Sequence, residues 1–370
     1  MGEGGGEDRL LRWLWRQLDR HHASPRRPRR QPSRQAPGGG APLIGDDAAI
    51  LPGGGPFAVT VDSQIAGVHF VPGLDAAVIA RRLLAVNLSD LAAMGAVPTY
   101  AFLALTAPPG FDHRRFFRAL LEACARHRLR LAGGDLSRGP ESARGTSARD
   151  RASAAGPAVI ATLTLIGRHR RGARWLRRAG AAPGHHLWLG GTIGESAAGR
   201  LLIGAGARLA GERVFLPEGW DPRRTLGAAA RRAVRRHLLP QPQLALGKWL
   251  ATQKAGAAID VSDGVARDLH RLCGASGVGA RIEAAELPLA PGFAALCAAL
   301  AADPEQLALG GGEDYVLLFT LPAGSEPPAR CGCRRIGTIT SRRRVLLIAD
   351  GEAAELPVAG WDHLEQVEDA

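Results

Sequence analysis

Acidic residues at the edges of apolar or glycine-rich segments are the side chains of this sequence with the clearest chemical potential. Solvated acids more often lie mid-helix beside arginine, which is the placement predicted for Glu122 and Asp268. Several buried carboxylates repel one another unless a cation neutralises them, and ligands that are all oxygen favour Mg²⁺ or Mn²⁺ over Zn²⁺. Each single acid has an ordinary alternative as a helix cap, a turn former or an ion-pair partner. The set that predicts a divalent-cation site is Asp46, Asp47, Asp62, Asp90, Asp135, Asp260, Asp263 and Glu313.

The segment AVNLSDLAAMGAVPTY contains the only asparagine of the chain. Asn87, Asp90 and Met94 follow one another at spacings of three and four residues, so a helix would place them on one face. We expect this face to point toward the cation site. The alternative is a polar patch that caps the edge of a sheet.

Glycines precede two of these acids, which points to phosphate chemistry. Gly133 and Gly134 stand before Asp135, and 310–312 are three glycines before Glu313. Glycine lets backbone N–H groups approach phosphate oxygens closely, and divalent cations neutralise phosphate charge. The Gly-Lys pair at 247–248 lacks the upstream glycine of a Walker A motif, and the protein-kinase HRD and DFG motifs are absent. The phosphate chemistry is therefore predicted on another fold.

Alternating strand-like and helical patterns predict an α/β (α+β) protein of two domains. The first domain begins with a strand at 57–62 and a long helix from Asp75 to about Met94, which Gly95 and Pro98 end. We expect a first domain at 42–168 with a low-complexity insert at 138–158, and a second domain at 169–370. Residues 1–41 are predicted to be a short helix and a disordered linker rich in arginine and proline. The further predictions are strands at 103–108, 129–134, 158–167, 185–191, 257–264, 315–322 and 345–350, helices at 112–127, 195–205 and 224–238, and another helix between the strands at 257–264 and 315–322.

The composition limits the partners and the compartment. The formal net charge is +12, but arginine is scattered and aromatic residues make up only 5% of the chain, so a solvated basic surface is favoured over nucleic-acid binding. The apolar run at 158–167 is too short to cross a bilayer, and the start of the chain has no export-signal pattern. Five cysteines without a CxxC pair favour a reducing cytoplasm. We therefore expect a cytoplasmic protein without a nucleic-acid or membrane partner.

In chain order, the motifs GDDAA, VD, GVHF, NLSDLAAMGA, GGD, RRAGAAPG, DVSDG, GGEDY and GWDH resemble those of the thiamine-monophosphate kinase family. The resemblance covers about 42–363, apart from the 138–158 insert. It implies the two-domain aminoimidazole ribonucleotide synthetase-like fold, with a mixed-sheet N-terminal domain and an α/β C-terminal domain. It also implies in-line transfer of the ATP γ-phosphate to thiamine monophosphate with Mg²⁺, by a homodimer that joins through the first-domain sheet.

The resemblance assigns roles residue by residue. Thiamine monophosphate would face His69, Glu313 and Trp361. ATP would contact Gly134, Asp135, Arg178 and Ser262, with Tyr100 packing on the nucleotide, and Asp90, Asp263 and Arg178 would be catalytic. Arg174 and Arg177 are alternatives to Arg178, and Val61 departs from the family, which often has threonine there. The metal ligands would be Asp47, Thr60, Val61, Asp62, Asp90, Asp135, Asp260 and Asp263.

Two relatives in the same superfamily and one other class remain as alternatives. Selenophosphate synthetase would need a reactive cysteine or selenocysteine in an N-terminal glycine-rich segment. The first cysteine of this chain is Cys124, which lies inside a predicted helix. Aminoimidazole ribonucleotide synthetase is the closer alternative, and GVHF and GWDH argue against it. An arginine-rich nucleic-acid-binding module is the alternative from a different class.

Overall fold

The computed structural model describes residues 56–139, 159–169, 172–220 and 224–361, together with Trp13 and Gln17. The chain forms two compact units, one comprising 1–87 and 98–168 and the other 88–97 and 169–370. The predicted N-terminal helix, the linker and the 138–158 insert lie almost entirely outside the described residues. Among the residues that the structure does describe, no helix is long and apolar enough to cross a membrane.

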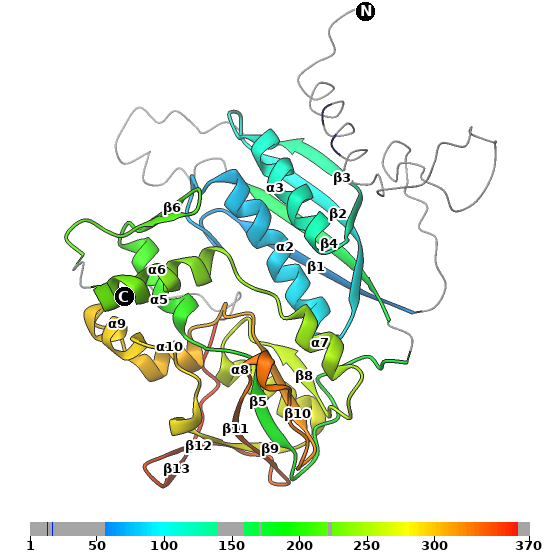
Figure 1. The fold of residues 1–370 in the computed structure, drawn as a ribbon, viewed down its shortest axis with the longest axis vertical. Helices are drawn as coiled ribbons and strands as arrows, with labels where there is room; N and C mark the ends of the chain where they lie inside the picture. Colours follow the sequence, from blue (N-terminus) through cyan, green and yellow to red (C-terminus); the bar gives the residue numbers. More distant parts are fainter. Residues whose placement is uncertain are drawn as a thin grey trace, which may run out of the picture. The chain divides into compact units, whose positions relative to one another are not determined.

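The first unit is built on a four-stranded sheet with the strand order β1-β4-β2-β3. β1 pairs antiparallel with β4, whereas β2 pairs parallel with β3, so the sheet is mixed. Helix α3 and the first turns of α2 lie along one face of this sheet (Figure 1). The elements are β1 (Phe57–Ile65), α2 (Ala76–Ala93), β2 (Val97–Ala107), α3 (His113–Arg126), β3 (Arg130–Arg138) and β4 (Ile160–Arg168).

The ends of the two helices have local causes. The side chain of Asp112 accepts a hydrogen bond from the backbone N–H of Arg115 and caps the start of α3. After α2 the chain turns at Gly95, whose φ is 67°. A Cβ atom on Gly95 would lie 2.6 Å from the Cβ of Ala251, so both the backbone conformation and the packing require glycine there.

The second unit contains a seven-stranded sheet with the order β13-β12-β9-β11-β5-β10-β8 and a separate two-stranded hairpin, β6-β7. Its strands are β5 (His186–Leu189), β6 (Arg208–Ala210), β7 (Arg213–Phe215), β8 (Ala258–Asp260), β9 (Gly279–Glu283), β10 (Leu317–Leu321), β11 (Arg334–Thr340), β12 (Val345–Ala349) and β13 (Glu352–Glu355). Its helices are α5 (Glu195–Gly204), α6 (Arg224–Leu238), α7 (Leu244–Leu250), α8 (Val265–Ser276), α9 (Phe293–Ala299) and α10 (Pro304–Gly310), with 3-10 turns η1 (Ala284–Glu286) and η2 (Ala329–Cys331).

Two helix contacts of the second unit matter for the site. Helix α8 packs on β8, β9, β10 and β12, and its buried side chains include Val265, Leu269 and Leu272. Helices α5 and α6 pack closely, since a Cβ on Gly199 would lie 2.2 Å from the carbonyl oxygen of Ala233. The glycine therefore lets the middle of α5 approach α6 at Ala233.

The long, strongly patterned segments predicted from the sequence are confirmed. β1, α2, α3, β4, α5 and α6 all form at the predicted positions, within one to three residues at the ends. The elements that were not predicted are the hairpin β6-β7, the strands β9, β11 and β13, and the short helices α7, α9 and α10. Apart from β11, these elements are too short to show a full hydrophobic period.

Candidate functional site

Three segments far apart in the sequence meet at the end of β8 in the second unit. The loop after β8 carries Ser262 and Asp263, and the backbone N–H of Glu313 donates to the carbonyl of Ser262 at 2.6 Å. The backbone N–H of Trp361 donates to the carbonyl of Asp263 at 2.9 Å. Asp260, the last residue of β8, is buried. The structure therefore brings together Ser262, Asp263, Glu313 and Trp361, four of the residues singled out from the sequence.

Glycines allow these segments to approach one another. A Cβ on Gly360 would lie 2.3 Å from the carbonyl oxygen of Asp263, and one on Gly312 would lie 2.8 Å from that of Ser262. Glu313 itself has a φ of 58°, in the left-handed region that a glutamate rarely adopts. Such backbone conformations persist where the surroundings enforce them, and they concentrate at functional sites.

Asp268, on helix α8, holds the loop after β8 by hydrogen bonds. This is contrary to the expectation that Asp268 is a solvated surface acid. It is fully buried, and one carboxylate oxygen accepts the backbone N–H groups of both Ser262 and Asp263 at 3.1 Å. Burial and the neighbouring charge of Asp263 raise the pKa of Asp268 to about 6, against the opposing effect of Arg271. The prediction was wrong because Asp268 shares the buried face of α8 with Val265, Leu269 and Leu272, a spacing of three and four residues that the sequence already displays.

Arg271 forms ion pairs with two of these acids. Its Nη1 lies 2.5 Å from Oδ2 of Asp263 and 2.8 Å from Oδ1 of Asp268. The carboxylate of Asp263 is therefore compensated by a guanidinium in this structure. A cation bound by Asp263 would compete with Arg271 for the same oxygen.

The second half of the GGED motif is tied to helices α5 and α6. Asp314 is buried and accepts the backbone N–H of Gly194 at 2.8 Å and that of Ser196 at 3.4 Å, at the start of α5. Burial raises the pKa of Asp314 to about 7, although these two N–H groups and the charge of Arg236 act in the opposite direction. Glu313 lies within 3.2 Å of Nδ1 of His237, near the end of α6. Neither His237 nor Asp314 was predicted from the sequence to be a site residue.

Of the three candidate arginines near RRAGAAPG, one already has a structural task. Arg174 donates from Nη2 to the carbonyl oxygens of Gln253 at 2.8 Å and Ala255 at 3.1 Å. The side chain of Arg178 is exposed, and its backbone carbonyl accepts a hydrogen bond from the hydroxyl of Ser276 at 3.0 Å. Arg178 thus has its guanidinium at the surface, whereas Arg174 uses its own to hold the backbone.

In the first unit, strand β1 separates its side chains onto two faces. Ala58, Thr60 and Asp62 are partly buried, whereas Phe57, Val59 and Val61 are exposed. Since side chains alternate along a strand, Val61 lies on the face opposite Thr60 and Asp62. The valine that departs from the family pattern therefore removes no side-chain oxygen from the face that carries Asp62.

Asn87 links helix α2 to this strand. Its Oδ1 accepts the backbone N–H of Asp62 at 3.2 Å, and its Nδ2 donates to the carbonyl of Leu83 at 2.9 Å. The side chain is fully buried. Asn87 therefore fixes the strand at Asp62, while Asp90 on α2 and Met94, directly after the helix, are only partly buried.

The other predicted residues of this unit lie in different surroundings. His69 is partly buried and accepts the backbone N–H of Ile65 at its Nδ1, 3.1 Å away. Tyr100 is buried in β2, with the guanidinium of Arg168 5.8 Å from its ring. Asp135 is exposed and accepts a hydrogen bond from the hydroxyl of Ser137 at 2.8 Å. Their contacts with a nucleotide, a substrate or a metal stay predictions.

Gly134 has a structural reason to be glycine. Its φ is 154°, and a Cβ there would lie 1.9 Å from the carbonyl oxygen of Leu103 in the neighbouring strand β2. The two strands approach too closely for any side chain. This requirement exists whether or not the backbone of Gly134 also contacts phosphate.

Comparisons with known proteins agree on one family. The profile of AIR synthase related protein, N-terminal domain, matches residues 45–162. The thiamine-monophosphate kinase of Escherichia coli strain K12 is 35% identical over 339 residues, which cover 86% of this chain and 91% of that protein. The chain belongs to the thiamine-monophosphate kinase family.

Solved structures of this family have the same fold. Thiamine-monophosphate kinase from Stenotrophomonas maltophilia K279a is 33% identical, with a TM-score of 0.67, over 84% of this chain and 90% of that one. AaThiL complexed with AMPPCP and TMP is 27% identical, also with a TM-score of 0.67, over 83% and 87%. The predicted aminoimidazole ribonucleotide synthetase-like α/β fold is therefore confirmed.

The acids that the family resemblance assigns to metal offer only oxygen donors, a set that suits Mg²⁺. Asp47 lies outside the described residues. Of the others, Asp62 and Asp135 belong to one unit and Asp90, Asp260 and Asp263 to the other. Across the described part of the chain, no three His, Cys, Asp or Glu side chains form a group that could hold a metal ion. The chemistry of the donors fits magnesium, and their convergence stays a prediction.

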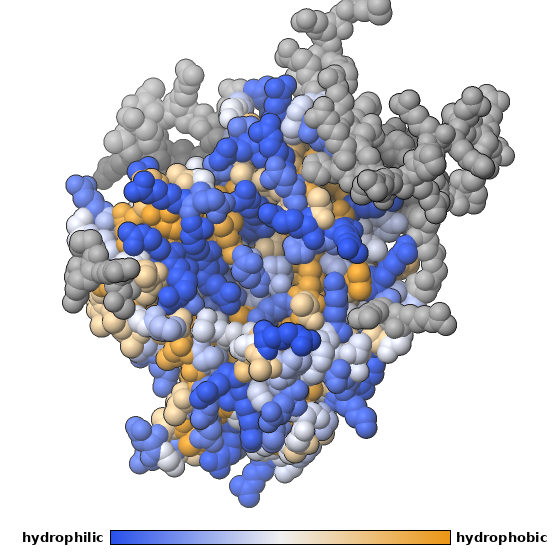
Figure 2. Space-filling model, viewed as in Figure 1, coloured by the Kyte–Doolittle hydropathy of each residue, from blue (hydrophilic) through white to orange (hydrophobic). Residues whose placement is uncertain are grey.

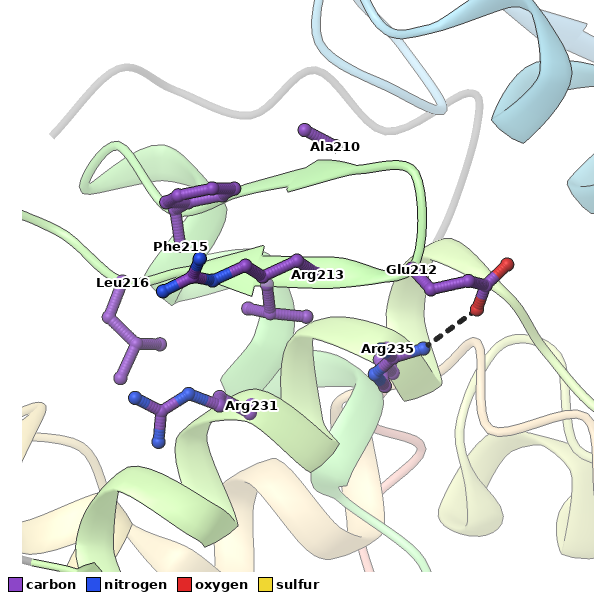
Figure 3. A pocket seen from close by; sticks show the side chains of 8 residues that line it. Ala210, Glu212, Arg213, Phe215, Leu216, Arg231 and Arg235 are labelled. Carbon is purple, nitrogen blue, oxygen red and sulfur yellow. Dashed lines mark hydrogen bonds and ion pairs between the residues drawn. The ribbon is translucent and has the colours of Figure 1, made fainter.

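A pocket of about 620 Å³ lies elsewhere in the second unit of this thiamine-monophosphate kinase family member, against the hairpin β6-β7 and helix α6 (Figure 3). Arg213, Arg231 and Arg235 line it, and Arg235 pairs with Glu212 at 3.3 Å. None of the site residues predicted from the sequence lines this pocket. We therefore place the candidate site at the loops that carry Ser262, Asp263 and Glu313, not here.

Proposed function

We propose that this protein transfers the γ-phosphate of ATP to thiamine monophosphate and releases thiamine diphosphate and ADP. The observation that carries the proposal is the 35% identity to the E. coli thiamine-monophosphate kinase along 91% of that protein. The complex of AaThiL with AMPPCP and TMP supports ATP as the phosphate donor and thiamine monophosphate as the acceptor. The meeting of Ser262, Asp263, Glu313 and Trp361 supports a common site for the assigned residues.

The chemistry that the residues must perform is set by charge. Two phosphate groups about 4 Å apart repel by roughly 4 kcal/mol per pair of unit charges at an effective dielectric near 20. The attacking phosphate oxygen is already anionic and needs no strong base. The transfer therefore proceeds in line, by positioning and electrostatic stabilisation, without a covalent enzyme intermediate.

Each residue has a distinct task in this proposal. The planar guanidinium of Arg178 binds phosphate oxygens, while Gly134 and Ser262 contact ATP and Tyr100 packs near the nucleotide. Glu313 and His69 face the thiamine end, and the ring of Trp361 stacks on the cationic heterocycle. Magnesium, when bound, neutralises phosphate charge. Its ligands in the proposal are Asp47, Thr60, the backbone of Val61, Asp62, Asp90, Asp135, Asp260 and Asp263.

We further infer that the active form is a homodimer that joins through the first-unit sheet. β1 is an edge strand in the described sheet, and its outer face exposes 42% of Phe57, 61% of Val59 and 58% of Val61. Exposed apolar edge strands are usually covered. Sedimentation of the wild type as a dimer and of Val59→Asp as a monomer is the expected result, whereas a monomeric wild type would exclude this arrangement.

An ATP-dependent reaction and three buried free cysteines, Cys124, Cys273 and Cys297, support a cytoplasmic location. The proposal includes no nucleic-acid or membrane partner. On the face shown in Figure 2, hydrophilic residues are interspersed with apolar ones. Salt-dependent retention on heparin that ATP and Mg²⁺ do not relieve would favour the nucleic-acid-binding alternative.

The test is an assay of the purified full chain with ATP, Mg²⁺ and thiamine monophosphate, with products separated by chromatography. We expect thiamine diphosphate and ADP in equal amounts. Omission of thiamine monophosphate should leave ATP intact. If ATP is consumed only with an aminoimidazole ribonucleotide synthetase substrate, the protein acts in the related reaction instead.

A further inference from the structure

The side chain of His237, on helix α6, lies beside the carboxylate of Glu313. His237 is buried, and its Nδ1 lies 3.2 Å from Oε2 of Glu313 and 3.2 Å from Oγ of Ser196. The three residues come from α6, the GGED segment and α5, all in the second unit. The imidazole therefore joins the two helices to the loop that carries Glu313.

The chemistry of the three groups fixes where the proton lies. An ionised carboxylate can only accept hydrogen bonds, so Nδ1 of His237 must carry the proton to interact favourably with Glu313. With the proton on Nδ1, the Ser196 oxygen can only accept from this nitrogen. This arrangement holds whether the imidazole is neutral or protonated at its second nitrogen.

The backbone of Glu313 is fixed, whereas its side chain is partly exposed. Its backbone is fixed by the hydrogen bond to Ser262 and by the left-handed φ of 58°. The side chain remains 24% exposed although one oxygen faces the buried imidazole. The neighbouring Asp314 is buried against the start of α5. Of the two adjacent acids, Glu313 is therefore the one that can present an oxygen to a ligand.

We propose that His237 is a positioning residue that fixes the carboxylate of Glu313 for the cationic thiamine end of the substrate. The proposal rests on the proposed function, because it requires thiamine monophosphate as the ligand of Glu313. A carboxylate bound by a buried N–H loses rotamer freedom before the substrate arrives, so less entropy is lost on binding. His237 acts on the affinity for thiamine monophosphate and not on the phosphoryl transfer or on ATP.

A purely structural role for His237 predicts a different outcome. In that case, substitutions of His237 would lower the stability of the protein and would weaken the binding of both substrates by similar factors. The distinction is therefore in the KM values for the two substrates and in the dependence of the effect on Glu313.

The experiment uses the full chain with His237→Leu, His237→Asn and His237→Gln. In Asn, the amide nitrogen stands close to the position of the imidazole Nδ1, whereas Gln carries its amide one bond further. We expect His237→Leu to raise the KM for thiamine monophosphate about tenfold or more and to change the KM for ATP by less than about twofold. His237→Asn should return the first value to within about threefold of wild type, and His237→Gln should not.

The decisive control repeats His237→Leu in a Glu313→Gln background, as a double-mutant cycle. Glu313→Gln alone should weaken the binding of thiamine monophosphate. The added His237→Leu should then have little further effect on the KM for this substrate. An equal effect in both backgrounds, or equal changes in both KM values, would overturn the proposal. If His237→Leu does not fold, His237→Asn and His237→Gln replace it in the same double-mutant cycle. The difference between their KM values for thiamine monophosphate then tests the proposal. A wild type that forms no thiamine diphosphate would instead reject the proposed function, and this inference with it.

Discussion

Asn87 accepts the backbone N–H of Asp62 at 3.2 Å and thereby fixes strand β1 to helix α2 at the residue assigned to metal binding. Asn87→Ala would leave that N–H without its side-chain acceptor next to a fully buried position. We expect the free energy of unfolding to fall by about 1–3 kcal/mol. Denaturant titration followed by circular dichroism measures it.

Ser89 provides the matched control on the same helix. Its hydroxyl is buried and has no hydrogen-bond partner among the residues that the structure describes, so Ser89→Ala removes no hydrogen bond within this part of the chain. We expect a change within about 0.5 kcal/mol. If the two variants lose equal stability, the hydrogen bond of Asn87 to Asp62 is not what stabilises this part of the chain.

Asp263 should be needed for turnover and hardly for stability. Its partly buried carboxylate pairs with the exposed guanidinium of Arg271, and Arg271 keeps Asp268 as a partner when the charge of Asp263 is removed. We expect Asp263→Asn to lower kcat at least about 100-fold and to change the melting temperature by a few degrees at most. Asp90→Asn should behave alike.

Glu122→Gln is the comparison for these two variants, because it neutralises an exposed acid in the middle of α3. Its kcat should equal that of the wild type. Turnover at the wild-type rate in Asp263→Asn would mean that this carboxylate serves only to pair with Arg271. Rates of thiamine diphosphate formation at saturating substrates give the answer.

Gly134→Ala should prevent correct pairing of β2 with β3. The new Cβ would lie 1.9 Å from the carbonyl oxygen of Leu103, and the backbone conformation at a φ of 154° disfavours a side chain. We expect a loss of more than about 3 kcal/mol or failure to fold. Gly139→Ala, at the end of the same segment, would place its Cβ at an ordinary 3.5 Å from Ala107 and should cost less than about 1 kcal/mol. Equal stability of the two variants would show that these strands can separate.

Local patterns predicted the elements well because each pattern is contained in one segment. The alternation in FAVTVD and the Gly95 stop after α2 required only neighbouring residues. Two missed residues also had local signals: Asp268 and His237 occupy positions on the apolar faces of α8 and α6, three residues after Val265 and Val234. A polar residue at an apolar helix position indicates a buried partner.

Local sequence patterns could not predict the long-range contacts of the site. The backbone hydrogen bonds that join Glu313 to Ser262 and Trp361 to Asp263 connect segments about fifty and one hundred residues apart. No spacing in the sequence specifies which loops meet at a sheet end, so the resemblance to a known family supplied that expectation.

Asp314 should make the stability of the protein fall as the pH rises. Burial raises its pKa from 3.8 to about 7, so the folded state keeps a proton that the unfolded state releases between these values. The stabilisation from this protonation is complete below about pH 3.8 and is lost as the pH rises through about 7. The full difference is on the order of 4 kcal/mol. Arg236 and Glu195 are the charged neighbours that modulate it.

Asp314→Asn removes this titration, although the amide keeps only one of the two hydrogen bonds to the start of α5. We expect the wild type to lose a few kcal/mol relative to the variant between pH 5 and pH 8, measured by denaturant titration at each pH. Asp350→Asn removes an exposed acid from the turn after β12 and should follow the wild-type curve. If wild type and Asp314→Asn have parallel curves, Asp314 is ionised in the folded protein throughout this range, and the N–H groups of Gly194 and Ser196 outweigh its burial.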